Sequence, residues 1–393
     1  MSNKISISIS SPEFKLLLSC AKVNASGNDI TIKEKLLLEG IDEQQLNSLV
    51  TRHRIAPLVY SHLRNSSSIS DNLKQQLKQQ ADDNVIKSLA SKQMIISLQH
   101  LLHSKQVNGL FLKGIPIAEQ YYGDISLRHT LDIDVWVEAS GLDTVAAFLK
   151  SKGYVSSPDW STLTPRQINY FKKTNHDLSF IPSHGLILPL IELHWKIRGP
   201  LGSFTLDPAI DFSMLSKQQI GNEEISVLHP VDNFLYLCTH GTEHAWFRLK
   251  WLFDLPNILS KVNFNWPDVL ARAKALNCSD HLCITFALLN DLFNIEIPEE
   301  IKSVSNEFNV ANALDSIYRS MASMSSVNSD DENRLSHLKY RLSQNKKGLF
   351  NWGLILTYLT SPNDWKLLPL PNYLFFLYFP LRPFLMVWRR VVR

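Results

Sequence analysis

Residues 109–138 read GLFLKGIPIAEQYYGDISLRHTLDIDVWVE, and this stretch decides the fold. An apolar segment ends in Lys-Gly, a helix-length segment follows at 115–122, and a basic turn leads to the alternating segment Leu-Asp-Ile-Asp-Val. Side chains two residues apart on a strand point to the same face. Asp132 and Asp134 should therefore share one face, while Ile133 and Val135 enter the core. Two carboxylates this close repel each other unless a cation binds them or one takes up a proton. The pair therefore predicts a metal-binding or catalytic site.

A third carboxylate follows in a second pair of predicted strands. Segments 176–181 and 188–196 alternate in polarity and are expected to form an antiparallel pair. Glu192 stands in the second of them, between two apolar residues that should enter the core, so Glu192 and His194 would face the site. Carboxylates from two neighbouring strands suit Mg²⁺ or Mn²⁺ together with substrate phosphates. Such a clamp serves two-metal displacement at a nucleotide α-phosphate.

The Lys113-Gly114 step lies between a predicted strand and a predicted helix. Glycine lets the backbone approach a phosphate, and a helix N-terminus favours its negative charge. Lys113 or Arg128 would offset the charge of a triphosphate. Arg128 has the alternative role of pairing with a carboxylate beside the site. His194 would orient a carboxylate, contact substrate or make a structural hydrogen bond.

The remaining chain predicts helices on both sides of this core. We expect an N-terminal helical region (1–107), an α/β core (108–228), a C-terminal helical region (229–345) and an aromatic, proline-rich tail (346–393). Pro57 should interrupt one N-terminal helix. A long helix should run from an N-cap at Asp71 to about residue 103, with Val85 and Leu89 among its core positions. Prolines in the tail should prevent a long amphipathic helix there.

Composition indicates a globular cytoplasmic protein. Of 393 residues, 45% are hydrophobic and 20% are charged, and the net charge of +3 is too small to imply nucleic-acid binding. The four cysteines lack metal-binding spacing and are expected to be reduced. We see no signal peptide and no apolar run of transmembrane length. The aromatic tail should pack on the helical region or, alternatively, lie peripherally on an anionic membrane.

These motifs together resemble the DNA polymerase beta-like nucleotidyltransferase superfamily. More closely, the chain is similar to a bacterial uncharacterised nucleotidyltransferase family with an LKG…RxxxDID…ELHW signature, and the flanks HRIAPLVYSHL (53–63) and HGTEHAWFRLKWLFDL (240–255) agree. The resemblance implies an α+β fold in which a small mixed sheet with helices lies between helical regions. It also implies transfer of a nucleoside monophosphate from an NTP, with ATP the first candidate, using metal ions held by Asp132, Asp134 and Glu192. Ile115 follows Gly114 where many superfamily members have serine, so the mode of phosphate binding differs.

The C-terminal flank offers further candidates. His240, His244, Arg248 and Lys250 are predicted to line the nucleotide cleft. Alternatively, His240, Glu243 and His244 fit the H-x-x-E-H pattern of a zinc hydrolase, although Gly241 weakens the helix that this pattern needs. The competing class is a catalytically degenerate protein that binds a nucleotide or another protein. The acceptor would be a sugar phosphate, a small metabolite, a peptide or a protein, and no sequence-specific nucleic acid is expected.

Overall fold

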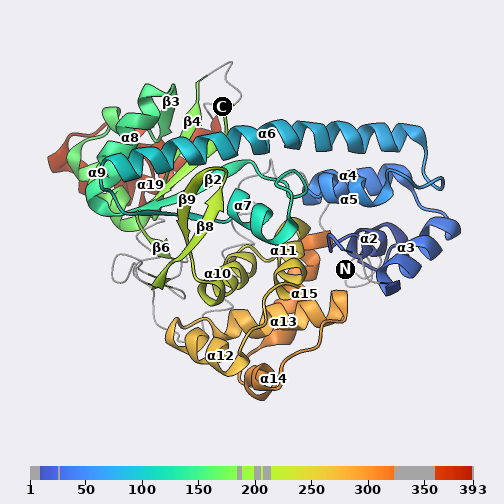
Figure 1. Cartoon of the computed structure of the whole chain (residues 1–393). Coiled ribbons are helices and arrows are strands. Elements are labelled where there is room, and N and C mark those ends of the chain that lie inside the picture. Colours follow the sequence, from blue (N-terminus) through green and yellow to red (C-terminus); the bar gives the residue numbers. More distant parts are fainter. Residues whose placement is uncertain are drawn as a thin grey trace.

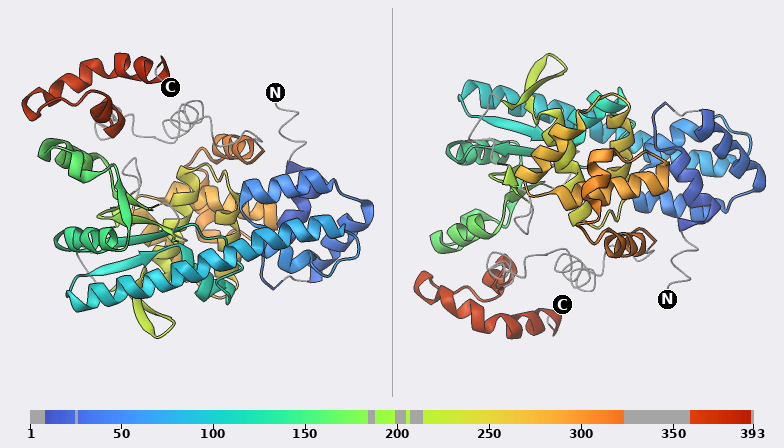
Figure 2. Two further views of the ribbon diagram at one scale, coloured as in Figure 1. Left: turned by 90° about the horizontal axis from the view of Figure 1, so that it is seen from above. Right: turned by 90° about the horizontal axis from the view of Figure 1, so that it is seen from below.

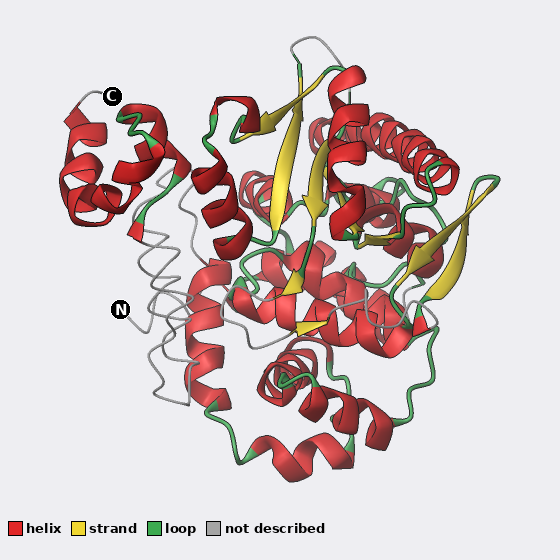
Figure 3. Cartoon of the chain, turned by 90° about the vertical axis from the view of Figure 1, so that its left-hand side faces the viewer, coloured by secondary structure: helices red, strands yellow, loops and turns green. Residues whose placement is uncertain are grey.

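The chain was analysed as a computed structural model, which describes residues 9–24, 27–183, 188–198, 205–206, 214–322 and 359–391 (Figure 1). A five-stranded sheet lies at one end of the molecule with helices packed around it, as Figure 3 shows. The strands are β1 (Gly109–Leu112), β2 (Asp132–Val137), β3 (Tyr154–Ser157), β4 (Asp177–Pro182) and β5 (Leu190–His194). Their order is β1-β2-β5-β4-β3.

The sheet is mixed, because β2 pairs in parallel with β5 while the other neighbours are antiparallel. The predicted α+β fold with a small mixed sheet is therefore confirmed. The predicted antiparallel pairing of β4 and β5 is also confirmed, with Ser179 opposite Glu192. Strand β3 was not predicted; only Tyr154 and Ser156 of its four residues are buried, so its apolar signal is short.

Helix α6 (Asp71–Ser104) runs the length of the molecule, from the N-terminal helices to the sheet (Figure 1). Its N-cap is Ser70, whose hydroxyl accepts from the Leu73 N–H, so the predicted cap at Asp71 is wrong by one residue. Val85 and Leu89 are exposed, which contradicts their predicted core positions. The middle of the helix instead buries Asn84, Ser88 and Ser91.

The reason for this polar middle is the turn that precedes β2. The Asn84 side chain donates to the carbonyl oxygens of Ser126 (2.8 Å) and Arg128 (3.2 Å) and accepts from the Thr130 N–H (3.1 Å). At Asn84, α6 therefore packs on backbone that needs hydrogen bonds. Asn84 thereby fixes the turn that leads into the two aspartates. The buried Ser88 and Ser91 hydroxyls have no hydrogen-bond partner among the described residues.

The helices that precede the α/β core in the sequence pack against the helices that follow it. The N-terminal helices are α2 (Pro12–Ser19), α3 (Gly27–Glu39), α4 (Glu43–His53) and α5 (Ala56–Leu63). The later helices are α10 (Pro230–Glu243), α11 (Leu249–Leu259), α12 (Trp266–Ala275), α13 (Ser279–Phe293), α14 (Glu299–Ser305) and α15 (Val310–Ala322). One apolar cluster includes residues of both sets, such as Phe14 and Phe253, and a second cluster fills the sheet side. The predicted break at Pro57 is confirmed, since Pro57 lies in the first turn of α5; α3 and α14 were not predicted.

Two short hairpins and the tail complete the chain. The hairpins are β6 (Ile197–Arg198) with β7 (Thr205–Leu206), and β8 (Ser216–Ile220) with β9 (Glu223–Val227). The tail forms α18 (Pro362–Leu367), η5 (Asn372–Leu377) and α19 (Tyr378–Val391), at the periphery of both views in Figure 2. Other predicted features, namely the turn at 184–185, the polar loop at 325–332 and the beginning of the tail, fall outside the described residues.

The structure corrects two predictions about the tail. Pro380 and Pro383 do not prevent a helix, because α19 continues through both. Pro380 is the third residue of that helix, where no helical hydrogen bond from its nitrogen is required. The described part of the tail packs on α9 (Pro165–Thr174) of the sheet region, through contacts of Tyr170 with Phe375 and Phe379. No helix within the described ranges is long and apolar enough to span a bilayer.

Candidate functional site

Strand register brings the predicted acids together. Asp134 is paired with Leu112 on β1 and with Glu192 on β5. Lys113 follows Leu112 directly, and its Nζ lies 3.0 Å from Asp134 Oδ1. His194, two residues beyond Glu192, places Nε2 3.2 Å from the same oxygen and 3.7 Å from Glu192 Oε2. We call these four residues, Lys113, Asp134, Glu192 and His194, the carboxylate centre.

Charges within the carboxylate centre compensate one another. Burial would raise the pKa of Asp134, but Lys113 and His194 hold that pKa well below its usual range. Burial would lower the pKa of Lys113, yet the Asp134 carboxylate holds it well above the usual range. Burial would likewise lower the pKa of His194, which its hydrogen bonds with Asp134 and Glu192 raise to about 9. The centre therefore holds a buried Asp134 carboxylate between two cations.

Glu192 differs from Asp134 in that its side chain is 30% exposed. Partial burial of the Glu192 carboxyl raises its pKa to about 7, and the negative charge of Asp134 raises it as well. Within the described residues, Asp134, Glu192 and His194 form the one group of three side chains that could hold a metal ion, with possible ligand atoms within 4.8 Å of one another. Carboxylate oxygens of this kind fit a hard divalent cation. Two of the three predicted metal ligands are therefore neighbours, whereas Asp132 lies outside the group.

The backbone between β1 and α7 (Gly114–Ile117) is unusual at two consecutive residues. Lys113 has φ 36° and Gly114 has φ 55°. Such values are rare for a residue with a side chain, and strain of this kind is common at functional sites. Gly114 is buried, and a Cβ there would lie 3.4 Å from the Asp132 carbonyl oxygen. The Lys-Gly step thus serves to turn the chain tightly and to aim Lys113 at Asp134.

Arg128 is part of a buried ion pair. Its Nε and Nη2 donate to the two carboxylate oxygens of Asp254 at 2.7 and 2.8 Å, and Tyr122 also donates to Asp254. Arg128 is 4% exposed and Asp254 is fully buried. This confirms the interpretation that Arg128 pairs with a carboxylate near the site. The pair joins the turn before β2 to helix α11.

Basic side chains from several segments form a second group, since the Asp132 carboxylate acts on Arg54 and Lys250 and Arg248 lies two residues before Lys250. We call Arg54, His129, Arg248 and Lys250 the basic cluster. Arg54 is the C-cap of α4, His129 belongs to the turn before β2, and the remaining two lie at the beginning of α11. Burial, together with the charges of Lys250 and Arg54, lowers the pKa of His129 to about 3. Burial lowers the pKa of Lys250 to about 8, although the Asp132 carboxylate counteracts it.

Several buried nitrogen atoms of the basic cluster are unpaired among the described residues. Nε and Nη1 of Arg248 are buried and have no hydrogen-bond partner in the described part of the chain, and the same holds for Nε2 of His129. Lys250, 8% exposed, makes no hydrogen bond or ion pair with the residues described. Buried polar groups are nearly always hydrogen-bonded, so these atoms are candidates for contacts with a ligand. The cationic side chains among them would donate to an anion.

A row of aromatic rings connects the two groups. His240 packs on His244 (ring centroids 4.7 Å apart) and on Trp251 (5.1 Å), and Phe247 packs on Trp251 (4.8 Å). Burial and the Lys113 charge hold the pKa of His240 well below its usual range. Arg248 lies over the Phe247 ring at 5.1 Å.

The described residues provide no third ligand for the zinc hydrolase alternative. His244 is the C-cap of α10 and lies outside the regular helix. No group of three metal ligands within the described residues includes His240 or Glu243. Gly241 has a packing role, because a Cβ there would lie 2.3 Å from the Trp246 ring.

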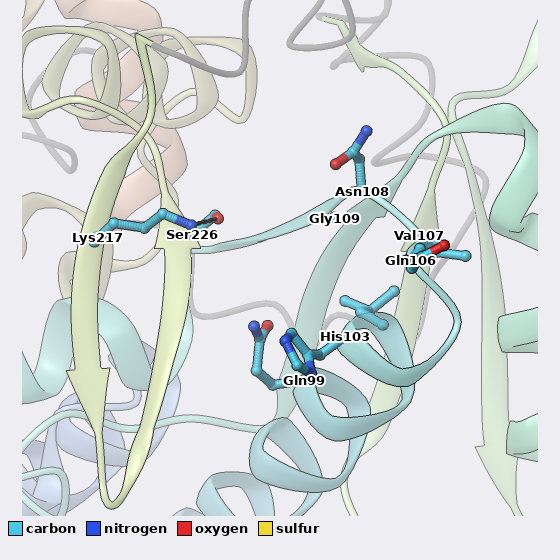
Figure 4. A pocket seen from close by; sticks show the side chains of 9 residues that line it. Gln99, His103, Gln106, Val107, Asn108, Gly109, Lys217 and Ser226 are labelled. Carbon is cyan, nitrogen blue, oxygen red and sulfur yellow. Dashed lines mark hydrogen bonds between the residues drawn. The ribbon is translucent and has the colours of Figure 1, made fainter.

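A hollow of about 500 Å³ lies away from this chemistry (Figure 4). It is lined by the end of α6, the beginning of β1 and the β8–β9 hairpin, with Gln99, His103 and Lys217 among its residues. Gly109 lies at this hollow, whereas Lys113 follows the opposite end of β1. The hollow includes none of the predicted site residues.

Sequence reasoning did not identify Arg54, His129 or Asp254. Arg54 lies within the 53–63 flank, and His129 directly follows Arg128, so both were adjacent to recognised motifs. No local sequence pattern links Arg54 to Lys250, because the proximity of these two residues depends on the packing of α4 against α11. That packing includes a hydrogen bond from the Leu249 N–H to His53 Nδ1.

The family comparison agrees with this geometry. The sequence model of a family described as "uncharacterised nucleotidyltransferase" matches residues 39–294. That span includes the carboxylate centre and the basic cluster. Searches of curated proteins and of solved structures gave no match.

Proposed function

The chain belongs to the uncharacterised nucleotidyltransferase family, and from that premise we propose that it transfers a nucleoside monophosphate from an NTP to an acceptor hydroxyl or phosphate. ATP is the first candidate for the NTP. The observation that carries the proposal is the β2–β5 register, which sets Asp134 beside Glu192 in a buried, charge-dense centre. A family assignment alone supports nucleotidyl transfer in general, so the substrates are part of the proposal.

In the proposed reaction, an acceptor oxygen attacks the α-phosphorus of the NTP. The bond from that phosphorus to the bridging oxygen of the β-phosphate breaks, pyrophosphate leaves with the bonding electrons, and the acceptor loses a proton. Asp134 and Glu192 would hold Mg²⁺ or Mn²⁺, with Asp132 on the same strand face. A divalent cation there would neutralise phosphate charge and lower the pKa of the attacking hydroxyl. The partly exposed Glu192 would also assist removal of the acceptor proton.

The basic cluster suits the triphosphate. Charge-assisted hydrogen bonds to phosphate are the strong ones, and the unpaired Arg248 nitrogens and the Lys250 ammonium could donate such bonds. These residues replace the contact that serine would make after Gly114. Lys113 supplies the positive charge nearest to the carboxylates.

One observation favours a second candidate function, a binding protein without catalysis. Lys113 and His194 already neutralise Asp134, as internal cations would do in a protein that no longer uses a metal. Such a protein would bind a nucleotide or another protein through the basic cluster.

The two candidates are separated by following α-labelled ATP with Mg²⁺ and a panel of sugar phosphates and peptides. Transfer of label with release of pyrophosphate supports the enzyme, provided that the double variant Asp132→Asn, Asp134→Asn is inactive. Activity of that double variant would refute the proposed mechanism. Nucleotide binding by calorimetry, without pyrophosphate release on any acceptor, would favour the binding protein.

A further inference from the structure

The outer surface of the tail helix α19 consists of apolar residues. Pro380, Pro383, Phe384, Val387 and Trp388 are all exposed and follow the spacing i, i+3, i+4, i+7, i+8 of one helix face. Phe384 is 71% exposed and Trp388 is 56% exposed. An uninterrupted apolar stripe of this kind is unusual on a water-facing helix and marks an interaction surface.

The opposite face of α19 anchors the helix to the protein. Tyr378 and Leu385 are buried in the apolar cluster of the sheet region, and the Tyr378 hydroxyl donates to the Leu368 carbonyl oxygen. Arg382 and Arg389 form ion pairs with the buried carboxylate of Asp364. Because one face is fixed by these contacts, the exposed stripe is held outward at the edge of the molecule (Figure 2).

Charge along the tail segment is mostly positive. Residues 362–393 contain five basic residues and one acidic residue, Asp364, which pairs with Arg382 and Arg389. Aromatic and basic side chains together are typical of segments at an anionic membrane surface. A symmetric contact between two copies of the chain would bring two such basic segments together, which their repulsion opposes.

We propose that the outer face of α19, with Phe384 and Trp388 at its centre, docks on an anionic phospholipid bilayer. The helix has 14 residues, so its length is about 21 Å, which is short of the roughly 30 Å hydrocarbon core. It would therefore lie in the interface, with its apolar stripe among the acyl chains and its basic residues near the lipid phosphates. This docking would hold the carboxylate centre at a membrane surface.

The test is co-sedimentation of the full chain with two kinds of vesicles. One contains equimolar phosphatidylglycerol and phosphatidylcholine, and the other contains phosphatidylcholine alone. We expect sedimentation with the anionic vesicles, loss of it in the double variant Phe384→Glu, Trp388→Glu, and weakening by added salt. The matched control is Ile30→Glu, Leu38→Glu, which places the same charges on two exposed apolar residues of α3 and should sediment like the unchanged chain.

Three outcomes would overturn the proposal. The first is that neither vesicle binds the unchanged chain, and the second is that neutral vesicles bind it equally well. The third is a dimer in light scattering that the Phe384→Glu, Trp388→Glu variant dissociates, since the stripe would then be an interface between copies. Circular dichroism of both double variants shows whether a loss of binding reflects a loss of fold.

Discussion

The carboxylate centre and the basic cluster lie around the two aspartates of one strand, yet their charges are arranged differently. At Asp134, each cation faces a carboxylate at 3.0–3.2 Å. Near Asp132, its carboxylate acts on the cations Arg54 and Lys250, and buried nitrogen atoms of Arg248 and His129 have no hydrogen-bond partner among the described residues. The charges of the first group compensate one another, whereas the second group is mostly basic. Under the proposed function, the carboxylate centre would be preorganised for a metal ion and the basic cluster would take the triphosphate.

The largest effect is expected from Asp134→Asn, which removes the charge that organises the carboxylate centre. Loss of one such electrostatic group typically costs roughly 10²–10³ in rate, so label transfer from ATP should fall at least that far. The control is Asp143→Asn, which changes an exposed carboxylate in the first turn of α8 (Leu142–Ser151) and should leave the rate unchanged. Full activity of Asp134→Asn would mean that the centre is not catalytic.

The same substitution at two buried arginines should have different effects on stability. Arg128→Gln leaves Asp254 as an unpaired buried charge, which we expect to lower the free energy of unfolding by about 3–5 kcal/mol. Arg248→Gln removes a cation whose donors are unused, so stability should be unchanged or higher. Urea denaturation of both variants measures this. Equal destabilisation would show that Arg248 has a structural role as well.

A smaller effect should follow from Lys250→Gln, which removes a charge from the basic cluster. Hydrogen bonds to charged groups contribute roughly 1.5–3 kcal/mol, so ATP affinity should weaken about 10- to 100-fold. Calorimetric titration with MgATP measures this, with Lys274→Gln on exposed α12 surface as the control. Unaltered ATP affinity in Lys250→Gln would place the triphosphate elsewhere.

The smallest effect is expected on the pH dependence of stability, through the hydrogen bond between His53 and Leu249 that joins α4 to α11. Burial lowers the pKa of His53 to about 3, and its Nδ1 accepts from the Leu249 N–H, so the folded protein holds it neutral. The unfolded chain takes up this proton below pH 6.5, and stability should therefore be full above that pH and fall below it, by about 2 kcal/mol at pH 5. His53→Asn keeps an acceptor that does not titrate, and thermal unfolding should show a weaker pH dependence. An unchanged pH dependence would mean that other groups control it.

Local patterns were sufficient to predict much of the fold. Period-two alternation at 132–137 and 190–194 identified the central strands, and the charged residues in them identified three carboxylates. The same reasoning failed in α6, where Val85 and Leu89 seemed to continue an apolar stripe. There the helix faces a turn that needs hydrogen bonds, and only the folded chain brings Asn84 to that turn.

The site was predicted least well where it depends on distant segments. Asp134 and Glu192 lie on neighbouring strands. The alternating pattern of each strand, with the assumption that the strands belong to one sheet, was therefore enough to link them. The Arg128–Asp254 pair spans the core and the C-terminal helices, and the approach of Arg54 to Lys250 spans the N- and C-terminal helices. Spacing in the sequence carries no information about such contacts. Placement of Asp132 near the basic cluster, apart from the three-ligand group, follows from those contacts.

The most direct test of the account is a titration with Mn²⁺ followed by electron paramagnetic resonance, with and without a non-hydrolysable ATP analogue. If the carboxylate centre binds the metal and the basic cluster binds the triphosphate, the analogue should tighten Mn²⁺ binding in the unchanged chain. Asp134→Asn should abolish that binding, and Lys250→Gln should remove only the gain from the analogue. Mn²⁺ binding that is unaffected by Asp134→Asn would contradict the account.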